Sequence, residues 1–104
     1  MSTQTPVFLV ASLQVEDMGS FQAGYVAPLK VINDRHGVEA IVATPQLTAL
    51  EGELKANVMA VLRFPSQVAL DAWYADPDYL PLIEARQAAT DQSVSTLVAL
   101  TPMA

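Results

Sequence analysis

Residues 7–37 read VFLVASLQVEDMGSFQAGYVAPLKVINDRHG, and the hydrophobic period changes within this stretch. Over residues 7–15 every second side chain is apolar, whereas the positions between them are mixed. This alternation is typical of a β-strand. Over residues 17–36 apolar side chains recur at steps of three and four, and Gly37 follows as a stop signal, which indicates an amphipathic helix. Pro28 removes one backbone donor inside that helix, so we expect a kink or a local widening there.

The next two apolar runs have the length and the β-branched content of strands. They cover residues 38–44 and 57–64. The connection between them is too short for a crossover helix, so the two strands are expected to pair as an antiparallel hairpin. A short additional strand near residues 47–50 is a further expectation of this pattern.

The second half of the chain repeats the helix-then-strand order. Ser66 is placed to cap a helix that continues to Asp76, where Asp76 and Pro77 signal a second helical start that runs to about Thr90. Residues 93–100 then supply a last strand. The sequence therefore predicts an α+β, ferredoxin-like βαββαβ fold, in which a four-stranded antiparallel sheet carries both helices on one face.

Composition limits the classes of protein to which the chain can belong. The chain has 104 residues, 52% hydrophobic and 15% charged, which predicts one domain with a core over about residues 7–100 and excludes intrinsic disorder. Its net charge of −6 and five scattered Lys and Arg residues disfavour a nucleic-acid partner. The absence of cysteine removes thiolate chemistry. Neither a signal peptide nor a membrane span is recognisable, so we expect no membrane partner and a cytoplasmic location.

The sheet face away from the helices is expected to be covered by a second copy of the chain. Residues 40–43, 58–62 and 97–100 are apolar on both faces of their strands, whereas one face of a monomeric sheet should turn polar. Exposing several hundred Å² of apolar surface is costly. A two-fold homodimer through this sheet face is the simplest solution, and a monomer with an exposed apolar face is the alternative.

The second half of the chain also carries a family resemblance. Residues 63–90 read RFPSQVALDAWYADPDYLPLIEARQAAT, in which the elements FPS, AWY, Pro77 with Tyr79, and Arg86 resemble the signature of the domain-of-unknown-function 1330 family. That resemblance implies a ferredoxin-like fold and a dimeric α/β barrel, in a superfamily that includes cofactor-free monooxygenases, muconolactone-isomerase-like enzymes, haem proteins and stress-response domains. The chain departs from the family pattern at residues 36–39, HGVE, and at Arg63, where relatives have an acidic residue.

Three residues are candidates for catalysis. His36 is the one side chain whose ordinary pKa lies near neutrality, although a histidine beside Gly37 can instead cap the end of its helix. Arg63 ends an apolar strand and could hold an anionic oxygen or pair with an acid at the rim. Tyr79 could share or move a proton, with a place in the core as the alternative.

Three more residues are candidates for ligand binding. Tyr25 beside Pro28 and Trp73 beside the helix break could line an apolar pocket, and Arg86 could reach into it, whereas core packing and ion pairing are the structural alternatives. No spacing of metal ligands or phosphate-binding glycines occurs, so no metal and no cofactor is expected. A haem protein would need His36 as the axial ligand.

The function expected from these residues is the binding of a small organic acid or of a phenolic or enolisable compound, in a pocket between the sheet and the helices. Turnover would then resemble that of a cofactor-free monooxygenase or isomerase. A non-enzymatic structural or sensing dimer is the competing hypothesis.

Overall fold

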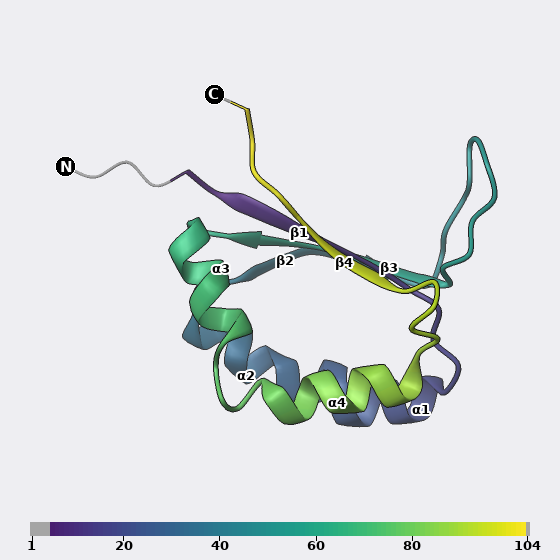
Figure 1. The fold of residues 1–104 in the computed structure, drawn as a ribbon, viewed down its shortest axis with the longest axis horizontal. Coiled ribbons are helices and arrows are strands. Elements are labelled where there is room, and N and C mark those ends of the chain that lie inside the picture. The colour runs from purple at the N-terminus through teal and green to yellow at the C-terminus, as the bar shows by residue number, and fades with distance from the viewer. Residues whose placement is uncertain (1–4, 104) are drawn as a thin grey trace.

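The computed structural model describes residues 5–103. It places four strands in one antiparallel sheet of order β2-β3-β1-β4, with the helices on one face (Figure 1). The elements in chain order are β1 (Val7–Leu13), α1 (Met18–Phe21), η1 (Gln22–Val26), α2 (Ala27–Arg35), β2 (Glu39–Thr44), β3 (Val58–Phe64), α3 (Gln67–Tyr74), α4 (Leu80–Ala89) and β4 (Thr96–Leu100). This arrangement confirms the ferredoxin-like α+β prediction.

The three N-terminal helical segments run on from one another without a break. Asp17 caps the first by accepting a hydrogen bond from the backbone N–H of Ser20 at 3.0 Å. Within η1 the helix widens to a π-turn, where the Ala27 N–H donates to the Gln22 carbonyl five residues earlier. Pro28, which has no N–H to donate, follows directly in the first turn of α2. The widening expected at Pro28 is therefore present.

Three boundaries differ from the sequence-based expectations. Residues 77–79 form a turn, and α4 begins at Leu80 rather than at Pro77, because the Asp76 carboxylate accepts the Asp78 N–H at 2.9 Å and closes a tight turn before the helix starts. The last strand begins at Thr96 rather than at Ser93, and the first ends at Leu13, with an isolated bridge beyond it at Val15.

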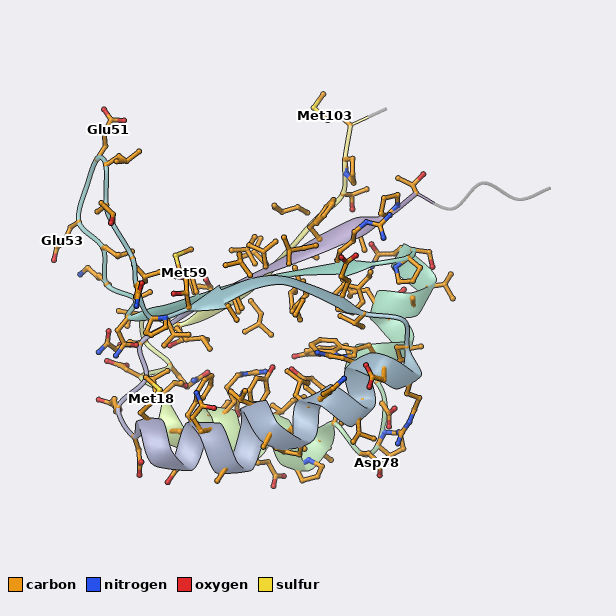
Figure 2. The ribbon with its side chains drawn as sticks, turned by 180° about the vertical axis from the view of Figure 1, so that it is seen from behind. Met18, Glu51, Glu53, Met59, Asp78 and Met103 are labelled. Atoms are coloured by element: carbon orange, nitrogen blue, oxygen red, sulfur yellow. The ribbon has the colours of Figure 1, made fainter. Side chains whose placement is uncertain are left out.

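The additional strand expected near residues 47–50 is absent, since these residues have no neighbouring strand with which to pair. The loop that contains them rises from the sheet on the side away from the helices. Figure 2 shows Glu51 and Glu53 on this loop and Met103 on the same side of the sheet, whereas Met18 and Asp78 lie in the helical layer.

The core lies between the sheet and the helical layer, and its largest fully buried side chains gather near α3 and the turn between α3 and α4. Its largest fully buried side chains are Val7, Phe64, Trp73 and Tyr79. The Trp73 ring packs edge-on against Phe64 of β3 at 5.1 Å between centroids, and against Tyr79 at 4.3 Å. These contacts hold the turn between α3 and α4 against the sheet.

The opposite face of the sheet carries an uncovered apolar surface. Strand register places a row of four valines side by side across all four strands: Val42, Val61, Val10 and Val98. Val42 and Val98 are 47% and 48% exposed. The apolar character predicted for this face is confirmed, and in a single chain nothing covers it. Across residues 5–103, no helix is long and apolar enough to cross a bilayer.

Candidate functional site

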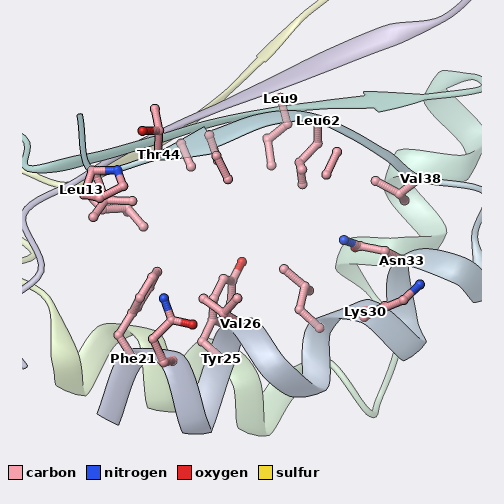
Figure 3. Close-up of a pocket in the computed structure, with 18 of the residues that line it drawn as sticks. Leu9, Leu13, Phe21, Tyr25, Val26, Lys30, Asn33, Val38, Thr44 and Leu62 are labelled. Carbon is pink, nitrogen blue, oxygen red and sulfur yellow. The ribbon is translucent and has the colours of Figure 1, made fainter. Parts of the chain in front are cut away.

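A cavity of about 530 Å³ lies between the sheet and the N-terminal helical segments (Figure 3). Its sheet side contains three alanines in register, Ala43 of β2, Ala60 of β3 and Ala11 of β1. The larger side chains Leu9 and Leu62, paired across β1 and β3, line the cavity in the flanking row. The space exists because small residues occupy the middle of the sheet where leucine or valine would fill it.

A β-bulge in the edge strand supports this arrangement. The β2–β3 register shifts between Ala40 and Val42, which leaves Ile41 as the additional residue. The shift allows Ala40 and Ala43, three positions apart, both to line the cavity while Val42 stays on the other face.

The helix side of the cavity is apolar apart from a few groups. Phe21, Tyr25 and Leu29 line it, with the Phe21 and Tyr25 rings stacked at 5.5 Å. In Figure 3 the Tyr25 ring points from the helix toward the sheet, and the side-chain nitrogen of Asn33 is directed into the space. Lys30 and Asp34 pair with each other at 3.0 Å at the exposed rim.

A chain of hydrogen bonds connects the cavity to a buried arginine. The Tyr25 and Tyr79 hydroxyl oxygens lie 2.8 Å apart, and Arg86 Nη1 donates to the Tyr79 oxygen at 2.8 Å. The Arg86 guanidinium also lies over the Tyr25 ring, 5.4 Å from its centroid. Burial raises the pKa of Tyr79 well above its ordinary value, so its hydroxyl remains protonated at neutral pH.

This chain of hydrogen bonds connects three of the predicted site residues, Tyr25, Tyr79 and Arg86. Of the three, only Tyr25 lines the cavity. Trp73 is fully buried in the core behind it, and its Nε1 donates to Asn33 Oδ1 at 2.8 Å. Trp73 therefore fixes the orientation of a lining residue.

His36 lies at a separate polar cluster between the end of α2 and the α3–α4 turn. Its Nε2 lies 2.8 Å from Asp76 Oδ2, to which Arg35 also donates at 2.8 Å. The hydrogen bond from His36, together with those from the Asp78 N–H and Arg35, lowers the pKa of Asp76 to about 2. The His36 ring thus ties two helical segments together and does not line the cavity.

Arg63 lies on the other side of the sheet from the cavity. Its neighbours Leu62 and Phe64 face the helices, and alternation along β3 directs Arg63 to the uncovered face, opposite Phe8 and Glu39. Arg63 and the chain from Tyr25 to Arg86 are thus on different faces. Within residues 5–103, no group of three or more His, Asp or Glu side chains is arranged to hold a metal ion.

Asn33 and the three alanines were not among the predicted site residues. The available signal for Asn33 was an amide next to Ile32, which lies on the buried face of the predicted helix. Nothing in the sequence marks Ala11, Ala43 and Ala60 as a group, because strand register alone aligns them.

The strand order, the one-sided helical layer and the cavity define a ferredoxin-like α+β protein. The family described as Domain of unknown function (DUF1330) matches residues 6–100, so the chain belongs to this family. No functionally curated protein matches the sequence.

Solved structures with the same fold share little sequence with this chain. A protein of unknown function from Rhodopseudomonas palustris has a TM-score of 0.79 at 19% identity, with 97% of this chain and 85% of that chain covered. A dimeric ferredoxin-like protein of unknown function from Jannaschia sp. CCS1 has a TM-score of 0.80 at 16% identity, covering 93% and 99%. SnoaB, a cofactor-independent oxygenase from Streptomyces nogalater, has a TM-score of 0.69 at 16% identity, covering 96% and 95%. At these identities the likeness shows the fold alone.

Proposed function

We propose that this protein binds a small, mainly apolar organic compound with an acidic, phenolic or enolisable oxygen in the cavity between sheet and helices. The observation that carries the proposal is an apolar space of about 530 Å³ lined by the Tyr25 side chain and the Asn33 amide. Ligand sites commonly have volumes of about 300–1,000 Å³, apolar walls and a small number of polar groups that fix orientation. A flat ring with one or two oxygens matches this combination.

The proposal includes self-association through the uncovered sheet face. The row of four valines supports it, since burying such a surface is favourable and two-fold dimers are the most common assemblies. The solved Jannaschia protein of the same fold is described as dimeric.

Two biochemical roles are compatible with a bound ligand. The first is turnover without a metal or nucleotide, as in a cofactor-independent oxygenase or an isomerase; the fold shared with SnoaB favours this role. The second is a non-enzymatic sensing module, for which ligand binding is the end point. Following each bound compound for oxygen uptake and chemical conversion distinguishes the two roles.

A thermal-shift screen with phenols, quinones, lactones and small carboxylates tests binding. A ligand at about one hundred times its Kd should stabilise the protein by about 2.7 kcal/mol, which is readily visible as a rise in Tm for a domain of this size. The Ala60→Leu variant adds a side chain to the cavity, and should raise the Tm of the free protein while abolishing the shift.

Ala88→Leu is the matched control, because Ala88 is exposed on α4 away from the cavity and should leave the ligand shift intact. Equal ligand shifts in the Ala60→Leu variant and the wild type would place binding elsewhere. A uniform absence of shifts would overturn the proposal.

A further inference from the structure

The positive charge of Arg86 is buried without a counter-ion. The residue is 5% exposed, and it forms no ion pair with any carboxylate among residues 5–103. Its partners are phenol groups, the oxygen of Tyr79 and the ring face of Tyr25. Burying a charge is costly unless negative charge or strong dipoles compensate it. An anion close enough to interact with the Arg86 guanidinium would therefore be favoured.

The two tyrosines supply a route from this charge to the cavity. Because Arg86 donates to the Tyr79 oxygen, the Tyr79 proton is available to the Tyr25 oxygen 2.8 Å away. The Tyr25 proton is then free for an acceptor in the cavity, which Tyr25 lines. Hydrogen bonds in such a chain polarise one another, so a charge at one end strengthens donation at the other.

We propose that the cavity binds its ligand as an oxyanion, the conjugate base of a phenol or enol, with the oxygen held by the Tyr25 hydroxyl and its charge balanced by Arg86 through Tyr79. This inference rests on the proposed function and specifies the form of the ligand. The ligand gives its proton to solvent, while both tyrosines keep theirs. Elevation of the Tyr79 pKa by burial supports its role as a lasting donor.

The surroundings favour a single anionic oxygen over a carboxylate. Arg86 does not line the cavity, so it cannot form the two parallel hydrogen bonds with which arginine usually binds carboxylates. The charged side chains that do line the cavity, Lys30 and Asp34, neutralise each other at the rim. The Tyr25 hydroxyl is the lining donor that Arg86 reaches through Tyr79, and one polarised hydroxyl matches the single oxygen of a phenolate or enolate better than the two oxygens of a carboxylate.

A coloured phenol tests the ionisation state directly. The 4-nitrophenolate ion is yellow and the neutral phenol is colourless, so absorbance measured against pH gives the pKa of the bound probe. We expect this pKa to fall by about one unit or more relative to the free probe, which corresponds to an approximately tenfold preference for the anion. Benzoate, of similar size, should bind at least about tenfold more weakly than the phenolate.

Variants that keep the ring packing isolate the hydrogen-bond chain. Tyr25→Phe and Tyr79→Phe each break the chain, and should abolish the pKa shift while retaining affinity for 4-nitroanisole, which has no ionisable proton. Tyr74→Phe is the matched control, because Tyr74 is 53% exposed and its hydroxyl is not part of the chain; it should keep the full shift.

Each outcome separates this inference from the proposal on which it rests. If 4-nitrophenol binds with an unchanged or raised pKa, or if Tyr25→Phe keeps the full shift, the oxyanion inference is overturned and ligand binding stands. If neither 4-nitrophenol nor 4-nitroanisole binds, both are overturned.

Discussion

The side-chain oxygen of Asn33 accepts a hydrogen bond from Trp73 Nε1 at 2.8 Å, and this contact orients the amide nitrogen toward the cavity. The relationship joins the end of α2 to α3 across the helical layer. The fully buried Trp73 thus holds Asn33 in the orientation in which its amide nitrogen faces the proposed ligand.

Replacing Asn33 should weaken binding of ligands that carry an acceptor oxygen. For Asn33→Leu we expect about fivefold lower affinity for a quinone, since one hydrogen bond contributes about 1 kcal/mol, and little change for a hydrocarbon such as toluene. Trp73 is the only tryptophan in the chain, so its fluorescence provides the binding signal. Asn33→Asp keeps an acceptor for Trp73 but removes the donor, and should lose quinone affinity as well. Unchanged affinity in both variants would contradict a donor role for Asn33.

Segment η1 approaches α4 closely at Gly24. A Cβ at this position would lie 3.1 Å from the Cβ of Ala85, whereas a Cβ at Gly19 would meet its nearest neighbour at an ordinary 3.7 Å. Alanine in a helix is favoured over glycine by about 1 kcal/mol, while overpacking costs about 1–3 kcal/mol. We therefore expect Gly19→Ala to raise the free energy of unfolding in urea titrations and Gly24→Ala to lower it. Equal stabilisation by the two substitutions would contradict this expectation, because it would show that η1 and α4 can move apart at Gly24 without a loss of stability.

The Asp76 cluster should make stability fall in acid. The pKa of Asp76 in the folded protein is lowered to about 2 from an ordinary 3.8, so the folded state favours the ionised carboxylate. Its contribution is complete above the pKa of the unfolded chain, and is lost as the pH falls from about 4 to about 2. Urea midpoints across this interval should decline more steeply for the wild type than for Asp76→Asn.

Asp78→Asn is the control for that comparison, since Asp78 shares the contact with Arg35 but is exposed. Its urea midpoints should follow the wild-type decline. A parallel decline in Asp76→Asn would assign the acid sensitivity to other carboxylates.

Charge placed within the valine row should dissociate the proposed homodimer. Val10 lies at the centre of the uncovered face, between Val61 and Val98, so Val10→Lys would put an unpaired charge into a buried apolar interface. Sedimentation velocity should show a monomer for this variant and a dimer for the wild type. Val31→Lys, on the outer surface of α2 where Val31 is 63% exposed, should remain dimeric. A monomeric wild type at micromolar concentration would contradict the proposal.

The fold was largely predictable because its signals are local. The strand and helix periods on either side of Asp17 specify β1 and the helical segments after it, and Ser66 caps α3 as expected. Boundaries were less predictable where a side chain competes with the helix for backbone donors, as Asp76 does before α4.

The candidate site depends on contacts that a single sequence does not contain. Tyr25 and Tyr79 are 54 residues apart, and their hydrogen bond joins the π-helical segment η1 to the turn between α3 and α4. Similarly, the sequence allows Arg86 either to reach a pocket or to pair with an acid, and only the tertiary structure shows that no carboxylate among residues 5–103 pairs with it. The roles predicted for His36 and Arg63 remain predictions, at positions away from the cavity.

The three alanines that leave space on the sheet side of the cavity, Ala11, Ala43 and Ala60, also bear on how the protein responds to hydrostatic pressure. Hydrostatic pressure favours the state of smaller volume, and the volume change of unfolding becomes more negative as more internal void is eliminated. If the apolar space of about 530 Å³ beside Ala60 holds no ordered water, we expect the empty protein to unfold at lower pressure than the occupied protein. A ligand that occupies this space reduces the void that unfolding would eliminate. Pressure-induced unfolding would therefore distinguish the occupied protein from the empty one, and neither the protein nor the ligand would need a label.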